Sequence, residues 1–421
     1  MDLLRKYLQQ IPEKQQDSGA IAYLAALSCL QAQCPAVAAG IMAELLAQRQ
    51  NLKLIASENY SSLAVQLAMG NLFTDKYSEG SIGHRFYAGC ENVDAIEQLA
   101  ATLAKEIFQC EHAYVQPPSG ADANLIAYWA ILVQQVQDKE VAKLQKKSAL
   151  ELTSVEYEKI RKLLVNQKIL GLSLNSGGHL THGYRQNISS KFMRAYSYEV
   201  DAKTGLIDYA ALEKQAAKIK PLILVAGYSA CPRLINFANM REIATSVGAV
   251  LLVDMAHFAG LVAGKVLRGE ENPVGYADII TSTTHKTLRG PRGGLILCSN
   301  AFKEIIDKGC PLVIGGPLPH VMAAKAVAFT EAKTDAFCTY AQQIVKNAKA
   351  LALAFQEAGL KVLTGGTDNH LVLIDVYSSL GLTGWQAEKA LRQAHITLNR
   401  NSIPNDQNGP WYASGIRMGT P

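Results

Sequence analysis

The sequence predicts an α/β fold with a mainly parallel central sheet that helices cover on both faces. Apolar runs typical of strands, such as 221–226 and 249–254, are continuous rather than alternating, and helical patterns separate them. Strands buried on both faces have this pattern because neither side meets water. The chain has 421 residues, of which 49% are hydrophobic, so it can form a large core and two or three domains.

The N-terminal part is expected to be helical. Residues 1 to about 50 are rich in Ala, Leu and Gln, and Pro12 and Pro35 are the expected breaks. A polar, glycine-containing stretch follows over 51–90, and no internal repeat is evident.

Strand-like and helical segments alternate over the rest of the chain. In order, we expect a helix over about 92–108, a strand at 113–116, a helix from Ser119 to 133, strands at 221–226, 249–254, 278–281 and 294–297 with a helix at 238–247 between the first two, a long helical section over 319–359, a strand at 371–375 and a polar loop over 399–415.

Residues 134–168 differ in composition from the segments around them, being rich in Lys, Gln and Glu. Thr153 and Glu156 are spaced as a capping box, which predicts an amphipathic helix after them. Its apolar positions are Val155, Ile160, Leu163 and Leu164. This composition favours a solvated surface insertion over a dedicated binding helix.

Charge and cysteine content exclude several classes of function. The net charge of +5 and the pI near 8.6 come from mixed basic and acidic residues, which gives no argument for a nucleic-acid or membrane partner. None of the eight cysteines has CxxC spacing, so no metal site is expected. Without a secretory layout or an apolar run of roughly 20 residues, we expect a soluble cytoplasmic protein with reduced thiols.

Two residues near strand ends suggest a cofactor site. Asp254 follows five apolar residues, where it is either a helix N-cap or a buried functional acid. Lys286 lies between Thr283 and a Gly-rich segment, 290–294. A lone lysine is usually a solvated charge, but pyridoxal-phosphate (PLP) enzymes need a lysine for a Schiff base and an acid against the pyridinium nitrogen.

The cofactor's phosphate would also need a binding place. Ser119 and Gly120 open the helix after the strand at 113–116, where free N–H groups and the helix dipole favour an anion. An ordinary serine N-cap explains these residues equally well by themselves. The order along the chain, phosphate turn, then acid, then lysine, favours the PLP interpretation.

Longer motifs give the chain a close resemblance to the serine hydroxymethyltransferase family. They are 54–60 (LIASENY), 76–80 (KYSEG), 176–183 (SGGHLTHG), 253–257 (VDMAH), 283–287 (TTHKT) and 414–417 (SGIR). The resemblance implies a fold-type I PLP-dependent transferase, similar to aspartate aminotransferase. It also implies an N-terminal helical arm (1–70), a large PLP domain (71–330) and a partial, truncated C-terminal α+β domain (331–421).

The resemblance also implies cofactor contacts. Lys286 would carry PLP, Ser119 and Gly120 would hold its phosphate, and Tyr77 with Gly315 and Gly316 would reach in from a second subunit of a homodimer. Around the ring, His179 would stack on its face, Asp254 would pair with its nitrogen and His257 would contact its oxygen.

Substrate contacts and catalytic groups follow from the same resemblance. Ser57, Arg417 and Arg292 would bind or orient the amino-acid carboxylate, Thr283 and His285 would support Lys286, and Glu79 of the neighbouring subunit would be the acid–base group. The folate residues would be Leu174, Gly178, Leu180, Tyr87 and Asn401. The implied reaction interconverts L-serine and tetrahydrofolate with glycine and 5,10-methylenetetrahydrofolate through a PLP aldimine and quinonoid.

Two other interpretations remain. Another PLP-dependent lyase or racemase, similar to threonine aldolase, would share Asp254 and Lys286 but would not need the folate residues. The second interpretation is a PLP-binding protein with impaired catalysis. It is suggested by the chain end at Pro421, four residues after Arg417. With so short a C-terminal segment, we expect Arg417 to be poorly held.

Overall fold

The computed structural model describes residues 3–421, which form two compact units. Of the described residues, the first comprises 3–54 and 389–398, and the second comprises 55–388 and 399–421. No helix of the described residues is long and apolar enough to cross a membrane.

The first unit consists mostly of helices. They are α1 (Leu3–Gln10), the short η1 (Glu13–Gln15), α2 (Ser18–Gln33) and α3 (Pro35–Gln50). Pro12 precedes η1 and Pro35 is the first residue of α3, so both prolines interrupt the helical pattern where the sequence predicts. A parallel pair of short strands, β1 (Leu52–Lys53) and β13 (Ile396–Thr397), completes the unit.

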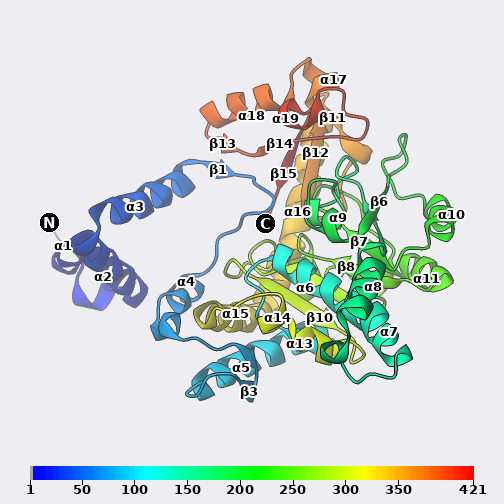
Figure 1. The fold of residues 1–421 in the computed structure, drawn as a ribbon. Helices are drawn as coiled ribbons and strands as arrows, with labels where there is room; N and C mark the ends of the chain where they lie inside the picture. Colours follow the sequence, from blue (N-terminus) through cyan, green and yellow to red (C-terminus); the bar gives the residue numbers. More distant parts are fainter. Residues whose placement is uncertain (1–2) are drawn as a thin grey trace. The chain divides into compact units, whose positions relative to one another are not determined.

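A seven-stranded sheet forms the centre of the second unit (Figure 1). In spatial order its strands are β4 (His112–Tyr114), β10 (Gly294–Cys298), β9 (Ile279–Thr283), β8 (Val250–Asp254), β7 (Ile223–Gly227), β5 (Lys168–Leu172) and β6 (Arg194–Tyr198). All neighbours from β9 to β6 are parallel, and β10 is antiparallel to both β9 and β4. The predicted α/β class with a mainly parallel sheet is confirmed.

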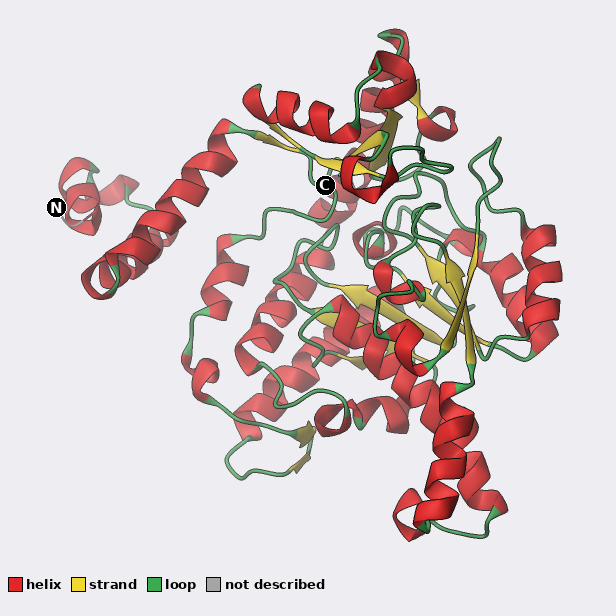
Figure 2. Cartoon of the chain, turned by 45° about the horizontal axis from the view of Figure 1, so that its top comes forward, coloured by secondary structure: helices red, strands yellow, loops and turns green. Residues whose placement is uncertain are grey.

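Both faces of this sheet are buried. Along β8, Leu251 and Val253 join one apolar cluster, while Val250 and Leu252 join another. Successive side chains of a strand point to opposite faces, so the two clusters lie on the two sides of the sheet. Figure 2 shows the strands enclosed between helices.

The helices that enclose the sheet and extend from it belong to the same unit. They are α4 (Leu63–Met69), α5 (Glu91–Phe108), α6 (Gly120–Leu132), α7 (Asp138–Lys143), α8 (Ser154–Val165), α9 (Ser189–Phe192), α10 (Tyr209–Ile219), α11 (Phe237–Val247), α12 (Ala259–Ala263), α13 (Lys303–Asp307), α14 (Gly309–Leu312), α15 (Pro319–Ala332) and α16 (Asp335–Glu357). The section predicted as one helical stretch over 319–359 is therefore two helices, because Thr334 caps the start of α16.

The distinct segment 134–168 contains α7 and α8. Thr153 and Glu156 form the predicted capping box at the start of α8. Ile160 is the one buried residue of this helix, and Val155 is 66% exposed. Most of the helix surface therefore faces solvent, as a surface insertion requires.

A second, antiparallel sheet has the order β11 (Lys361–Val362), β12 (Leu371–Asp375), β15 (Gly415–Gly419) and β14 (Asn399–Asn401). The short helices near it are α17 (Val376–Leu380), α18 (Gly384–Gln393) and α19 (Gly409–Tyr412). The expectation of a loop throughout 399–415 is wrong at 399–401, which pairs with β15, and at 409–412, which forms α19. Arg417 consequently lies in a strand with a neighbour on each side.

Candidate active site

The parallel strands place their carboxyl ends at one edge of the central sheet, and a cavity of about 400 Å³ contains residues that follow these ends. It is lined by Ser57, Leu174, Gly178, His179, Leu180, Ser229, Ala230, His257, Lys286, Arg400, Asn401, Ser402, Pro410 and Arg417. The structure thus brings together predicted residues that the sequence separates by up to 360 positions, from Ser57 to Arg417.

Lys286 follows β9 and is held by its backbone. Its carbonyl oxygen accepts hydrogen bonds from the Asn59 side chain (2.8 Å) and from the amide of Arg289 (3.0 Å). The surrounding loop is closed because the Gly290 amide donates to the Thr284 carbonyl at 2.7 Å. The lysine stem therefore starts from a fixed position, and Lys286 lines the cavity. Asn59 was not predicted as a site residue, although it lies in the motif at 54–60.

The environment of Lys286 makes its amine more reactive than that of an exposed lysine. Burial, opposed by the charge of Asp254, lowers the pKa of Lys286 to about 8. Near neutral pH a larger fraction of the amine is therefore unprotonated and able to attack a carbonyl.

This lowered pKa predicts how cofactor uptake depends on pH. In protein freed of cofactor, the rate of PLP attachment should rise about tenfold per pH unit below pH 8 and level off above it, since only the free amine attacks. The rate is measured from the growth of visible absorbance after mixing. A midpoint near the ordinary lysine pKa would contradict the assigned environment.

Asp254 lies at the end of β8 and is held by several donors. Its Oδ2 accepts hydrogen bonds from Asn124 Nδ2 (2.9 Å) and His182 Nε2 (3.1 Å), and its Oδ1 accepts from the Ala256 amide (3.1 Å). Burial favours the neutral acid, but the hydrogen bond from His182 and nearby positive charge, that of Lys286 included, lower the pKa of Asp254. Its carboxylate therefore stays ionised, as a partner for a protonated ring nitrogen must.

A chain of hydrogen bonds extends from this acid to His179. Asn124 Nδ2 also donates to Thr181 Oγ1 at 2.9 Å, and Thr181 Oγ1 lies 2.6 Å from His179 Nδ1. Burial lowers the pKa of His179 to about 4, so its ring is neutral near pH 7. Asn124, Thr181 and His182 were not identified from the sequence as site residues, since only the fold places them beside Asp254.

His179, His182 and Asp254 offer ligand atoms within 4.8 Å of one another, a spacing that could suit a metal ion. The hydrogen bonds favour a polar network instead. His182 Nδ1 accepts from the His179 amide at 3.3 Å, so its Nε2 carries the proton donated to Asp254. A protonated nitrogen has no lone pair for a metal.

The predicted phosphate turn lies at the N-terminus of α6. Ser119 caps this helix, accepting from the Asp122 amide and donating to Asp122 Oδ2 at 2.6 Å. A Cβ on Gly120 would lie 2.6 Å from Thr283 Cγ2, so the turn packs against the end of β9. The free amides of the turn therefore lie close to the strand that leads to Lys286.

Arg417 is firmly held, contrary to what the nearby chain end leads us to expect. Its Nη1 donates to the Ser229 carbonyl at 2.7 Å, and its Nε donates to Asn399 Oδ1 at 3.0 Å. Burial lowers the pKa of Arg417 to about 10, which leaves the guanidinium charged near neutrality. Strand pairing on both sides fixes its backbone, so the cation can bind a carboxylate in the cavity.

His257 and His285 differ in their partners. His257 Nδ1 lies 3.2 Å from Nε2 of the fully buried His370, and burial lowers the pKa of both rings, to about 3 for His370. His285 Nδ1 is buried without a hydrogen-bond partner among the described residues. Burial and the charge of Lys286 lower the pKa of His285 to about 3, so this ring is also neutral.

Another group of predicted residues forms a separate cluster. Tyr77 and Tyr87 donate hydrogen bonds to Glu79 at 3.2 and 3.4 Å, and a Cβ on Gly316 would lie 3.0 Å from the Tyr77 ring. Among the described residues that line the Lys286 cavity, none comes from this cluster or from Gly315. Arg292 is exposed and outside that lining too, although its charge contributes to the lowered pKa of Lys286.

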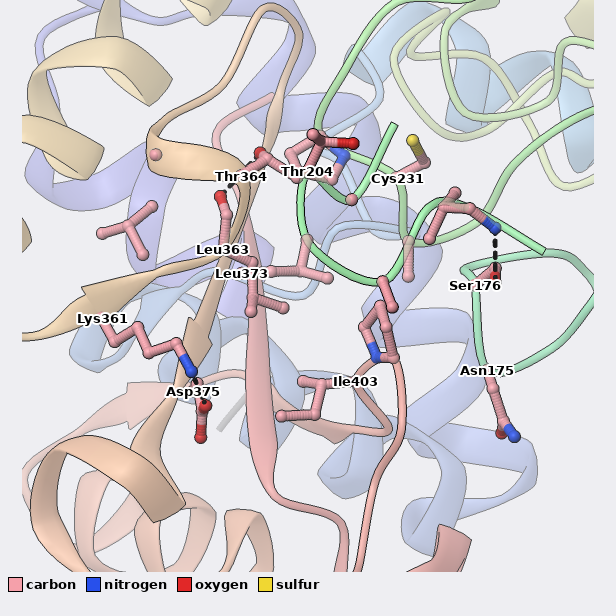
Figure 3. A pocket seen from close by; sticks show the side chains of 18 of the residues that line it. Asn175, Ser176, Thr204, Cys231, Lys361, Leu363, Thr364, Leu373, Asp375 and Ile403 are labelled. Carbon is pink, nitrogen blue, oxygen red and sulfur yellow. Dashed lines mark hydrogen bonds and ion pairs between the residues drawn. The ribbon is translucent and has the colours of Figure 1, made fainter. Parts of the chain in front are cut away.

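A second cavity, of about 540 Å³, shares Ala230 and Ser402 with the Lys286 cavity. Figure 3 shows the Lys361 side chain directed toward Asp375 in its wall, at an Nζ–Oδ2 distance of 2.9 Å. Its other walls include Thr204 and Thr364. Lys361 is 60% exposed and paired with Asp375, whereas Lys286 is buried and shares its cavity with His179 and Arg417, so the smaller cavity is the candidate active site.

The side chains around the Lys286 cavity fit PLP. An amine of lowered pKa can form the covalent link, the ionised Asp254 retains an acceptor position on Oδ1, and the start of α6 can receive the phosphate. Together with the covered parallel sheet, these groups define a fold-type I PLP-dependent enzyme.

Comparison with known proteins identifies the family. A family model described as serine hydroxymethyltransferase matches residues 30–145 and 133–421. Serine hydroxymethyltransferase of Treponema pallidum (strain Nichols) is 59% identical over 418 residues, which are 99% of this chain and 73% of that protein. The chain belongs to the serine hydroxymethyltransferase family.

Two further relatives have the same name. The protein of Mycolicibacterium smegmatis is 57% identical over 405 residues, 96% of this chain and 82% of that protein. The protein of Chlamydia trachomatis serovar D is 55% identical over 421 residues, all of this chain and 84% of its own length. The family uses PLP to exchange a one-carbon unit between serine and tetrahydrofolate, with glycine as the other product, and is typically homodimeric.

Proposed function

We propose that the Lys286 cavity is where this chain interconverts L-serine and tetrahydrofolate with glycine and 5,10-methylenetetrahydrofolate. The observation that carries this assignment is the convergence of Lys286, Arg417 and His179 on one cavity of about 400 Å³. PLP bound there would supply an electron sink for cleavage of the bond between Cα and Cβ of serine.

Three groups bind and orient the cofactor in this proposal. Lys286 holds it covalently, the Ser119–Gly120 turn binds its phosphate, and Asp254 keeps its ring nitrogen protonated. His179 lies against the ring, where a neutral imidazole stacks without adding charge. His257 contacts the ring oxygen, and Thr283 and His285 keep the lysine loop in place.

Other residues bind the substrates. Arg417, with Ser57 and Arg292, binds the carboxylate of serine or glycine. Leu174, Gly178, Leu180 and Asn401 contact the folate, and the first three belong to the segment that follows β5 and includes His179.

A second copy of the chain completes the site. Tyr77, Gly315 and Gly316 would contact the partner's phosphate, while Glu79 would exchange a proton near the partner's substrate and Tyr87 would contact the folate. The half-exposed Tyr77 and Tyr87, gathered around Glu79 outside the Lys286 cavity, support this arrangement. In the proposed domain division, 1–70 is an arm, 71–330 the large domain and 331–421 the small domain.

A cytoplasmic location is part of the proposal. The eight cysteines, Cys29, Cys34, Cys90, Cys110, Cys231, Cys298, Cys310 and Cys338, are all free thiols in the structure. A reducing compartment keeps such thiols in this form. Fractionation of the native cells and detection of the chain with an antibody tests this location.

The overall assignment is tested by glycine formation from serine. The purified chain should release glycine at a rate that rises with added tetrahydrofolate and saturates. A chain that cleaves L-allo-threonine but shows no folate-dependent glycine formation would contradict the hydroxymethyltransferase assignment and support an aldolase.

Replacing Arg417 with lysine tests the carboxylate contact. Lysine keeps the charge but loses the planar guanidinium that can make paired hydrogen bonds, so KM for serine should rise about 10- to 100-fold with a smaller change in kcat. Arg233→Lys is the matched control, because Arg233 is also a partly buried arginine, bound to Asp368 and Thr364. Equal KM values for Arg417→Lys and the unchanged chain would contradict the role of Arg417.

A further inference from the structure

Arg85 holds the backbone on both sides of Glu79. Its Nη1 donates hydrogen bonds to the carbonyl oxygen of Ser78 at 3.0 Å and to that of Gly80 at 2.9 Å. The side chain of Arg85 is only 4% exposed, although it lies in a segment whose tyrosines are half exposed. A buried cation therefore fixes the peptide units that flank the proposed acid–base group.

Two carboxylates fix the guanidinium in turn. Arg85 Nη2 donates to Glu97 Oε2 at 2.5 Å, and its Nε donates to Asp94 Oδ1 at 2.7 Å. Both acids lie on α5, and the side chain of Glu97 is 5% exposed. Four hydrogen bonds from one planar guanidinium restrict its rotation, a geometry that a lysine ammonium cannot reproduce.

The same network extends to the strand before the phosphate turn. Gln116 Nε2 donates to Glu97 Oε1 at 2.8 Å and to the Gly80 carbonyl at 2.9 Å. Next to it, the fully buried Lys325 donates to the carbonyl oxygens of Val115 and Pro117 at 2.6 and 3.0 Å. The segment around Glu79 is thus bound to the buried segment that follows β4.

The backbone at Gly80 shows how tightly this segment is shaped. Gly80 has a φ of +105°, and a Cβ there would lie 2.3 Å from the carbonyl oxygen of His84. Arg85 holds this bend at both neighbours of Glu79. The Glu79 carboxylate itself contacts only the hydroxyls of Tyr77 and Tyr87 among the hydrogen bonds of the described residues. The Glu79 side chain therefore leaves the backbone between the two carbonyl groups that Arg85 holds, and only two tyrosine hydroxyls bind its carboxylate.

We propose that Arg85 is a positioning residue, which aims the Glu79 carboxylate for proton transfer at the hydroxymethyl group of the substrate. This inference rests on the role proposed for Glu79. Arg85 contacts no substrate in this view, and its effect passes through the backbone of residues 78–80.

Arg85→Lys tests the inference. With the charge kept and the planar donor set lost, kcat for folate-dependent glycine formation should fall about 10- to 100-fold, because small displacements of a reacting group have effects of this size. KM for serine and the visible absorbance of bound PLP should stay nearly unchanged. The matched control is Arg241→Lys, since Arg241 also binds a carbonyl oxygen and a carboxylate, those of Tyr276 and Asp278.

A double substitution separates positioning from general loss of structure. If Arg85 acts through Glu79, Arg85→Lys should lower kcat little further when Glu79→Gln is already present. An unchanged kcat in Glu79→Gln alone would refute the role of Glu79. The role of Arg85 would be refuted if the two substitutions together lowered kcat by the product of their separate fold-losses. It would also be refuted if Arg241→Lys lowered kcat as much as Arg85→Lys does. Neither result would contradict the role of Glu79.

Asp94→Asn decides the matter if Arg85→Lys fails to fold. The Asp94 side chain is 24% exposed, and its two oxygens accept from Arg85 Nε and from the Gly83 amide. Asparagine has one acceptor oxygen for these two donors, so the variant weakens the support of Arg85 with little effect on packing. The inference requires a kcat about three- to tenfold lower, at unchanged KM, because the guanidinium keeps its other partners. A kcat equal to that of the unchanged chain would overturn it.

Discussion

Replacing Lys286 with alanine is expected to abolish serine–glycine exchange and the covalent retention of PLP. Lys286 lines the cavity and supplies an amine of lowered pKa, and its backbone is held by Asn59 whatever its side chain is. Without a covalent link the reaction loses its preformed electrophile, so kcat should fall by at least about 10³-fold. Turnover of serine with tetrahydrofolate measures this loss.

The position of the link can be read independently of turnover. Borohydride reduction followed by peptide mass spectrometry should place the cofactor on the peptide that contains Lys286, and no labelled peptide should remain in Lys286→Ala. Lys333→Ala is the control, because Lys333 is a half-exposed lysine paired with Glu106. Cofactor bound covalently elsewhere in the Lys286→Ala protein would refute the assignment.

The sequence allowed five of the seven strands and the catalytic edge to be predicted from local patterns, whereas β5 and β6 were not expected. Asp254 ends the apolar strand β8, and Lys286 lies three residues after the next predicted strand, β9. The parallel class followed from the helices between them. The antiparallel direction of β10 could not be predicted in this way, since a continuous apolar run has the same appearance in either direction.

The support of the site depends on contacts between distant segments. Asn124 reaches Asp254 across 130 residues, and Asn59 reaches Lys286 across 227. Polar side chains such as these usually occur at surfaces or helix caps, so their sequence positions alone gave no reason to select them. Their motif neighbours were the available signal, since Asn59 lies in 54–60 and His182 in 176–183.

For Arg417, the sequence led to the wrong expectation that the residue is poorly held. Its position near the last residue suggested a frayed end, yet β15 pairs with β12 and with β14. Strand register is a tertiary property, and β14 itself was expected to be part of a polar loop. Distance from the chain end therefore mattered less for Arg417 than backbone hydrogen bonding and contact with Ser229.

Replacing Asp254 with asparagine is expected to lower kcat about 100-fold or more while Lys286 still binds the cofactor. The negative charge that keeps the ring nitrogen protonated would be lost. Both oxygens of Asp254 accept hydrogen bonds, Oδ2 from Asn124 and His182 and Oδ1 from the Ala256 amide. Whichever position the NH2 group of the asparagine takes, it would therefore face a hydrogen-bond donor and lose that bond. The variant should therefore have a lower thermal unfolding temperature as well.

Two comparisons separate the lost charge from the lost stability. Asp278 does not line the cavity, and its carboxylate accepts from Arg241 and from the Leu251 amide. Asp278→Asn should therefore lower the thermal unfolding temperature without a matching loss of kcat. Asp254→Glu keeps the charge and should retain more activity than Asp254→Asn. A folded, cofactor-loaded Asp254→Asn protein with kcat close to that of the unchanged chain would refute the pairing of Asp254 with the ring nitrogen. A neutral amide cannot stabilise the protonated ring nitrogen as a carboxylate does.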